Sequence, residues 1–364
     1  MRLFKLQNPP SYDYNNCMNN QTKTVLPAEW TPQDAVLLCW PHQSMDWQSI
    51  LPEVEATFDE LSYYICESQQ LIIIAHDADH QAHIEQRLSN RGARLTAVQW
   101  LLHHNNDSWC RDFGPITVLK DNQPVAVNCE FNGWGNKYAH QLDNNTNQAL
   151  VENKLITCPL LTTDLVLEGG SIDSDGAGTI LTTSQCLLDK QRNPALNKQQ
   201  IESHLKDLLG AQRIIWLNSG ELEGDDTDSH IDNLARFCNS ETIAYAHCDD
   251  MHDPHYTPLK QLEAELNQLK TLQGKAYKLI PLTIPGAKYF QQQRLPASYV
   301  NFLIINKFVL MPTYNDPQDT INLAQLQAVF ADRKVIGIDC CSVIKQSGSI
   351  HCLTMQLPRH TVNN

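Results

Sequence analysis

Short apolar runs alternate with amphipathic segments along the whole chain, and this alternation limits its fold more than any other feature. The apolar runs are rich in Val, Ile, Leu and aromatic residues, and most end in turn residues, as strands do. Several amphipathic segments open with Pro or Asp, which is typical of the first turn of a helix. Strands are expected at Ala35–Trp40, Leu71–His76, Ile116–Leu119, Leu165–Glu168, Thr179–Thr183, Arg213–Leu217, Thr242–His247, Tyr299–Pro312 and Lys334–Ile338, and helices at Pro52–Ser68, Asp77–Ser89, Pro194–Leu209, Pro258–Gln273 and Pro317–Ala331. The pattern predicts an α/β protein with more strands than helices.

The predicted helices often lie about 60 residues apart, which favours a repeated ββα-type unit even though the sequence shows no clear self-similarity. No long linker or low-complexity tract interrupts the 364 residues. The most loop-like interior segment, Ala139–Asn153, is itself short. We therefore expect a single domain over residues 27–364, preceded by an N-terminal extension over residues 1–26.

The formal net charge of −14 argues against nucleic acid as a partner, because nucleic-acid binders usually carry basic patches. An acidic cleft would concentrate a small cationic substrate, although the same charge could serve only to keep the protein in solution. No uncharged apolar run reaches the roughly 18 residues that a membrane helix needs. The most apolar stretch, Tyr299–Met311, contains Asn301, Asn306 and Lys307, so no membrane association is expected.

The N-terminal segment Met1–Asn20 is polar where an export signal needs an apolar run, and we therefore expect a cytoplasmic protein. Its twelve cysteines are scattered and form no C-x-x-C pair. In a chain of this length without an export signal, reduced thiols are the better interpretation. Neither a disulfide framework nor a structural zinc site is expected.

Four segments place reactive side chains beside turns, and the first is Asn106–Pro115, NDSWCRDFGP. Its Arg–Asp pair precedes Gly114 and Pro115, a combination that fixes a turn. Asp112 could bind a cation beside an aromatic wall offered by Trp109. The alternative is a structural Arg–Asp ion pair, and this segment, considered by itself, favours that alternative.

In the second segment, LVLEGG, Glu168 ends an apolar strand before two glycines. It is either a functional carboxylate or an exposed Glu at a strand end.

The third segment, Gly224–Arg236, reads GDDTDSHIDNLAR. If it is extended, Asp226, Asp228, His230 and Asp232 share one face, because side chains alternate along a strand. Carboxylates around an imidazole favour its charged form and suit acid–base chemistry. A metal site or an acidic loop would show the same spacing.

The fourth segment, Gln346–Thr354, reads QSGSIHCLT and places Cys352 after a Gly/Ser turn, where a thiol can act as a nucleophile. A lone cysteine is more often a core residue. His351 precedes it, but neighbours on an extended chain point to opposite faces, so His230 is the expected partner. A thiol, an imidazole and several carboxylates suit attack on a planar guanidinium, whose nitrogens carboxylates bind in a bidentate way.

These segments, in this order, resemble the agmatine deiminase and bacterial-type peptidylarginine deiminase family, within the guanidine-modifying (pentein) superfamily. The resemblance covers about residues 27–358 and is carried by PAEWTPQDAVLLCWPH, NDSWCRDFGP, LEGGSIDSDGAGTILTT, DDTDSHIDNLARF, PASYVNFLIIN and SGSIHCLT. It implies a pentein α/β propeller of ββαβ-like repeats around a central active-site funnel. The chain departs from the family pattern at Ser229, Ser349, Phe113, Cys110 and Asp173, none of which is a catalytic position.

The resemblance also implies roles for individual residues. Cys352 matches the nucleophile and His230 the catalytic histidine. Asp112 and Asp232 match the guanidinium-binding aspartates, and Glu168 matches the acidic residue of the L-E-G-G motif. Two further positions, Trp109 and Asp226, match residues that line the substrate in agmatine-specific members.

The expected reaction is hydrolysis of agmatine to N-carbamoylputrescine and ammonia through a covalent thiouronium on Cys352, without metal or organic cofactor. The small cationic guanidine is the expected partner, and a homo-oligomer is compatible with the sequence. Three alternatives are a peptidyl-arginine deiminase giving peptidyl-citrulline, a metal-dependent hydrolase using the Asp/His cluster, and a binding protein without activity. The complete set of matching residues argues against the last.

Overall fold

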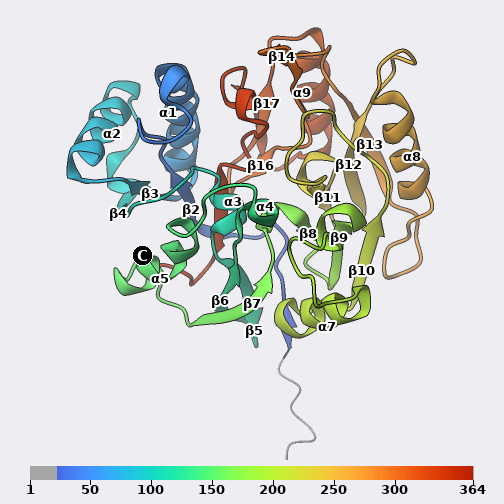
Figure 1. Ribbon diagram of the computed structural model, residues 1–364, viewed down its shortest axis with the longest axis horizontal. Helices are drawn as coiled ribbons and strands as arrows, with labels where there is room; N and C mark the ends of the chain where they lie inside the picture. Colours follow the sequence, from blue (N-terminus) through green and yellow to red (C-terminus); the bar gives the residue numbers. More distant parts are fainter. Residues whose placement is uncertain (1–22, 364) are drawn as a thin grey trace, which may run out of the picture.

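The computed structural model describes residues 23–363, and it confirms the expected α/β class (Figure 1). The described strands form five sheets of three or four strands and one short hairpin. The sheets comprise β1 (Thr24–Val25), β5 (Ile116–Lys120), β6 (Gln123–Glu130) and β7 (Leu160–Val166); β8 (Ile172–Ser174), β9 (Thr179–Thr183) and β10 (Arg213–Leu217); β11 (Ala235–Asn239), β12 (Thr242–His247) and β13 (Lys278–Thr283); β16 (Leu303–Ile304), β17 (Phe308–Thr313) and β18 (Lys334–Asp339); and β19 (Thr354–Pro358), β2 (Gln33–Cys39), β3 (Gln70–Ala75) and β4 (Val98–Leu102). The hairpin is β14 (Tyr289–Phe290) with β15 (Gln293–Arg294).

The five sheets share one local topology. In each, an antiparallel pair is followed by a parallel partner, as in β8–β9–β10, β11–β12–β13 and β16–β17–β18. The parallel step requires a crossover, and helices supply it. In the fifth sheet the antiparallel partner of β2 is β19, so that the C-terminal strand completes a sheet begun near the N-terminus. A ββαβ-like unit therefore recurs without visible sequence repetition.

The longer helices are α1 (Leu51–Ser68), α2 (Ala78–Arg91), α5 (Thr146–Glu152), α7 (Lys198–Leu209), α8 (Tyr256–Leu266) and α9 (Pro317–Val329). The single-turn helices are α3 (Cys110–Phe113), α4 (Gly133–Asn136) and α6 (Ser184–Leu187), and the 3-10 turns are η1 (Gln48–Ile50), η2 (Leu95–Ala97), η3 (Asp143–Asn145), η4 (Gly169–Ser171), η5 (Ile231–Asn233) and η6 (Val343–Gln346). Figure 1 shows α1, α2, α7, α8 and α9 on the outside of the molecule and α3 and α4 near its middle.

Local signals explain where the outer helices begin and end. Asn197 and Asp316 form capping boxes at the starts of α7 and α9, and Pro317 occupies the first turn of α9. Gly210 ends α7 in the left-handed conformation that glycine adopts without strain. The predicted helices match α1, α2, α7, α8 and α9, although α7 begins at Lys198, later than the predicted Pro194.

Two expectations were wrong in detail. The run Tyr299–Pro312 is not one strand, because the chain reverses at Ile305–Phe308 so that β16 and β17 pair with each other. The segment Ala139–Asn153 is not mainly loop, since it contains α5, whose Leu150 is fully buried. Packing of Leu150, with Ala149 and Val151 beside it, against the core stabilises this short helix.

Most of the expected N-terminal extension, residues 1–22, lies outside the described residues. Of the remainder, β1 pairs antiparallel with β5. Strands β2 and β3 are buried on both faces, as expected for parallel strands covered by helices. Among residues 23–363, no helix combines the length and the apolar character required to cross a bilayer.

Candidate active site

A cavity with a volume of about 340 Å³ is formed by loops from several of the sheets. Four residues singled out from the sequence line it: Asp112, Cys352, Trp109 and Asp226. Behind this wall lie Glu168, His230 and Asp232, each fully buried. The fold therefore brings together all seven residues to which the family resemblance assigns a role.

Cys352 lies on the turn that leads into β19, and its thiol faces two polar groups. Asn301 donates from Nδ2 to Sγ over 3.1 Å, and Oδ2 of Asp232 lies 3.6 Å from Sγ. Burial raises the pKa of the Cys352 thiol well above its usual value, and Asp232 and Asp112 raise it further. In the free enzyme the sulfur therefore holds its proton.

Asp112 lies in the single turn α3, where two neutral donors fix its carboxylate. The backbone N–H of Gly170 donates to Oδ1 and the indole of Trp134 donates to Oδ2, each over 2.9 Å. Burial raises the pKa of Asp112. The adjacent Arg111 turns away, donating instead to the carbonyl of His351. The structural Arg–Asp ion pair considered from the sequence is not what this turn contains.

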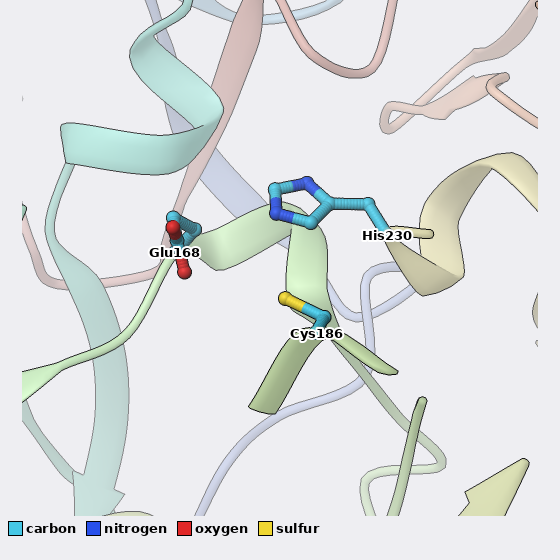
Figure 2. A group of neighbouring side chains, drawn as sticks. All are labelled: Glu168, Cys186 and His230. Atoms are coloured by element: carbon cyan, nitrogen blue, oxygen red, sulfur yellow. The ribbon is translucent and has the colours of Figure 1, made fainter. Parts of the chain in front are cut away.

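His230 lies at the start of η5, with Nδ1 3.6 Å from Oδ1 of Asp112. Burial lowers its pKa, but Asp112, Cys186 and Glu168 together outweigh burial and hold the pKa of His230 well above its usual value. Figure 2 shows the side chains of Glu168, Cys186 and His230 pointing toward one another. Among residues 23–363, neither ring nitrogen has a hydrogen-bond partner. The surroundings of His230 therefore favour the charged form of its ring.

Glu168 is not an exposed residue at a strand end, because its side chain is fully buried. Arg192 donates from Nε to both carboxylate oxygens, over 2.8 and 3.1 Å. The same guanidinium donates to Asp228 and to the carbonyl of Thr227. Arg192 thus compensates the buried charge of Glu168 and ties it to the loop before His230.

A metal ion is poorly suited to the one group of possible ligands found among residues 23–363. Glu168, Cys186 and His230 offer ligand atoms within 4.8 Å of one another. However, Arg192 already occupies both oxygens of Glu168, and the charged form of His230 offers no lone pair to a metal. The geometry therefore favours proton transfer over metal binding at this position.

Gly170 is required by close packing at the centre of the site. A Cβ atom placed there would lie 2.6 Å from Nδ1 of His230, 2.8 Å from Oδ1 of Asp112 and 3.2 Å from Oδ2 of Asp232. Only a residue without a side chain allows these three groups to converge. This is the physical reason for the second glycine of the LEGG segment.

Carboxylates and aromatic rings surround the mouth of the cavity. The lining includes Asp46, Asp107 and Asp226, together with the rings of Trp109 and Tyr138. Burial raises the pKa of Asp107 to about 8, and the neighbouring acids add to this effect. Burial also raises the pKa of Asp226 to about 6, with a further contribution from Asp225. Several acids gathered at one mouth favour a positively charged ligand.

The segment Gly224–Arg236 is not extended, contrary to the expectation from its alternating acids. Asp228 and Ser229 both have a positive φ of 65°, and the segment continues into η5. Asp228 consequently points to Arg192 and Lys137 rather than into the cavity. Asp226 reaches the mouth, where the hydroxyl of Tyr138 donates to it.

Five residues of the site carried no sufficient signal in the sequence: Asn301, Trp134, Arg192, Glu29 and His351. Trp134 has a positive φ of 54°, which is uncommon for a bulky residue and often marks a functional site. His351 was set aside because an extended chain would point it away from Cys352. The chain is a turn at this point, and His351 instead contacts Asp232.

Comparison with known proteins places these residues in a family. The Porphyromonas-type peptidyl-arginine deiminase family matches residues 25–358. The chain belongs to this family. The match spans both Asp112 and Cys352, so the whole of the site described above lies within the matched residues.

Individual members of the family share nearly the full length of the chain. The agmatine deiminase of Pseudomonas syringae pv. tomato is 33% identical, over 92% of this chain and 95% of the relative. A crystal structure described as a candidate peptidyl-arginine deiminase is 44% identical, with a TM-score of 0.89, over 93% of this chain and all of that one. A cysteine-to-serine variant of the agmatine deiminase of C. jejuni, with substrate bound, is 35% identical, with a TM-score of 0.88, over 96% of this chain and all of that one.

Proposed function

We propose that this family member hydrolyses agmatine to N-carbamoylputrescine and ammonia. The observation that carries the proposal is the thiol of Cys352 beside the buried carboxylates of Asp112 and Asp232. Oδ1 of Asp232 is buried and, among residues 23–363, has no hydrogen-bond partner. A buried carboxylate oxygen without a donor is costly unless a ligand supplies one. A guanidinium supplies planar N–H groups that match such carboxylates.

In the first half-reaction, Asp112 and Asp232 bind the guanidinium and present its central carbon to Sγ of Cys352. As the cationic substrate binds, the thiol releases its proton to solvent water, and the thiolate attacks that carbon, forming a tetrahedral adduct. His230 donates a proton to one nitrogen, the C–N bond breaks, and ammonia leaves. The product of this half is an S-alkylthiouronium on Cys352.

In the second half-reaction, the neutral His230 accepts a proton from water, which attacks the same carbon. The C–S bond then breaks, releasing the ureido product and restoring the thiol. Glu168, held by Arg192, stabilises the imidazolium that forms at the end of each cycle. No step requires a metal ion.

Activation of the thiol is assisted by the substrate. Because burial and two carboxylates raise the pKa of Cys352, the free enzyme avoids a thiolate beside Asp232. A bound guanidinium adds a positive charge between the carboxylates and the sulfur, which favours the thiolate. The nucleophile is therefore formed when the substrate is in place.

The mouth of the cavity favours a dication over a peptide. Agmatine carries a second positive charge at its far end, and Asp46, Asp107 and Asp226 line the mouth. A peptidyl-arginine would bring neutral backbone to these carboxylates. The relative from C. jejuni is named an agmatine deiminase, in agreement with this choice. Peptidyl-arginine remains the second candidate because the 44% identical structure is described as a peptidyl-arginine deiminase.

Three finer assignments accompany this function as proposals. The recurrence of the ββαβ-like unit supports a pentein propeller of such units around a central funnel. A single deiminase domain over residues 27–364 accounts for the family match. A cytoplasmic location, self-association and the lack of a nucleic-acid partner are predictions that rest on the sequence alone.

A colour assay for ureido groups tests the function directly. Purified protein is incubated in parallel with agmatine, free arginine and a short arginyl peptide, each with and without a chelator. Turnover of agmatine alone, unchanged by the chelator, supports the proposal. Turnover of the peptide in place of agmatine would support the thiol mechanism but show that agmatine is not the substrate. Loss of activity with the chelator would show that the metal-free mechanism is wrong.

A further inference from the structure

His351, the residue directly before the nucleophile, lies between two carboxylates. Its Nδ1 is 2.7 Å from Oδ2 of Asp232 and its Nε2 is 2.8 Å from Oε2 of Glu29. All three side chains are buried. The backbone holds the imidazole in place as well, because the N–H of His351 donates to Oδ1 of Asn301 and its carbonyl accepts from Arg111.

Each ring nitrogen of His351 faces a carboxylate. Burial raises the pKa of Glu29, but Arg236 and His351 more than offset it and hold that pKa far below its usual range. Burial likewise raises the pKa of Asp232, but the bond from His351 and the neighbouring His230 and Arg236 together outweigh it, so that the pKa is lowered. His351 therefore bridges two ionised carboxylates.

Charged groups surround His351 in a buried cluster. The cluster contains the guanidinium groups of Arg111 and Arg236 and the carboxyl groups of Glu29, Asp173 and Asp232. Arg236 donates to Oε2 of Glu29 over 2.7 Å and to Asp173 over 3.3 Å, and Arg111 lies 3.9 Å from Glu29. Removing His351 would take away the hydrogen bond that Oδ2 of Asp232 receives from the ring.

Resting on the proposed function, we infer that His351 is a positioning residue that holds Asp232 turned so that its free Oδ1 faces the guanidinium. The ring of His351 binds Oδ2, the oxygen that also lies 3.6 Å from Sγ of Cys352. The second oxygen is thereby left for the substrate. Glu29 contacts the other ring nitrogen and is itself bound by Arg236, so that the chain Arg236–Glu29–His351–Asp232 orients the guanidinium site.

Two substitutions at position 351 test the inference. His351→Leu removes both bonds and leaves only more distant cations, among them His230 and Arg236, to act on Asp232, so that the pKa of this buried carboxyl rises. Agmatine turnover at pH 7 should fall about a hundredfold in kcat/KM, as expected when one partner of a buried ion pair is lost. KM should rise at pH 7 and recover toward the wild-type value as the pH rises and Asp232 loses its proton.

His351→Asn is the conservative variant, because its side-chain amide can donate to Asp232 while losing the bond to Glu29. At pH 7 the kcat/KM of His351→Asn should exceed that of His351→Leu by about tenfold or more, because a hydrogen bond to a charged group contributes about that much. His255→Asn is the matched control, since His255 is also a buried histidine, accepting from Glu223, but lies outside the cavity lining. It should leave kcat/KM and the pH profile unchanged.

The outcome that overturns the inference is an His351→Leu enzyme whose kcat/KM falls by the same factor at every pH, without rescue by Asn. An unchanged kcat/KM in His351→Leu would overturn it equally. Neither result touches the proposed function, which fails if the wild-type protein does not turn over agmatine. Circular dichroism of each variant confirms that the fold is retained before the kinetics are compared.

Discussion

The side-chain amide of Asn301 donates from Nδ2 to the sulfur of Cys352 over 3.1 Å, and it does so within a densely charged site. The neighbouring carboxylates disfavour a thiolate, and burial disfavours it more. Asn301 opposes both, since a hydrogen bond to the charged form of an acid lowers the pKa of that acid. Its Oδ1 meanwhile accepts from the backbone N–H of His351, which fixes the turn that carries the nucleophile.

Replacing Asn301 should therefore slow the chemistry rather than weaken binding. Asn301→Ala should lower kcat for agmatine by about ten- to a hundredfold, corresponding to a hydrogen bond to a charged group. The acidic limb of the rate profile, on which the rate rises as the thiol loses its proton, should move to higher pH, because the thiol then holds its proton more strongly. Stopped assays between pH 6 and about 10, the ordinary range of thiol and tyrosine titration, measure both effects.

Asn301→Asp separates the two functions of the amide. The carboxylate keeps an acceptor for the backbone of His351 but removes the donor to sulfur and adds a negative charge. Turnover should fall further than in the Ala variant. An Asp variant as active as the wild type would show that the amide donor does not stabilise the thiolate.

Arg192 is predicted to contribute to stability as well as to the site. Arg192→Met leaves Glu168 buried and unpaired, and breaking a buried pair in this way costs about 3–5 kcal/mol. Urea unfolding should show a correspondingly lower midpoint at pH 7. Adding Glu168→Gln to this variant removes the unpaired charge and should restore part of the loss. Equal stability of Arg192→Met and wild type would contradict the role given to this ion pair.

The raised pKa of Asp107 predicts that the protein becomes less stable as the pH rises. Its pKa is raised to about 8 in the folded protein, against about 3.9 in an unfolded chain. The folded state thus binds the extra proton, and stability falls as the pH rises between these values. Asp107→Asn should melt at a higher temperature than the wild type at pH 8.5, with the difference shrinking toward pH 4.

The control for this experiment is Asp46→Asn, an exposed residue at the same mouth. Its melting temperature should differ little from the wild type at either pH. If Asp107→Asn behaved like this control, the mouth would not hold a destabilised carboxylate. Adding agmatine should also raise the melting temperature of the wild type more than that of Asp107→Asn, because the dication compensates this charge.

The fold followed from the sequence where local signals and burial agree. The predicted helix start at Pro317 is that of α9, whereas the predicted start at Pro194 precedes that of α7, which Asn197 caps. The apolar runs of β2 and β3 mark strands buried on both faces. Tyr299–Pro312 was misjudged because hydrophobicity cannot show a reversal in a run that is buried throughout. From the sequence, Asn301 served only as a polar residue that argues against a membrane helix. In the structure its amide contacts the nucleophile.

Some residues of the site were also predictable from the sequence, and others were not. Cys352, His230, Asp112, Asp232 and Glu168 stand in recognisable motifs, and the fold brings them together. Arg192 lies in an ordinary polar stretch, so that only the tertiary structure shows its bond to Glu168. Asp226, Asp228, His230 and Asp232 were placed on one face by assuming an extended chain, an assumption that the positive φ of Asp228 invalidates.

Covalent attack by Cys352 on agmatine is tested most directly by intact-mass spectrometry of enzyme quenched in acid during turnover. We expect a species heavier than the free enzyme by agmatine less ammonia, with the added mass mapping to Cys352 after peptide digestion. Cys352→Ser should show no adduct and should lose at least about a thousandfold in kcat, as enzymes deprived of their nucleophile do. Agmatine turnover that persists in Cys352→Ser, with no adduct in the wild type, would contradict the account.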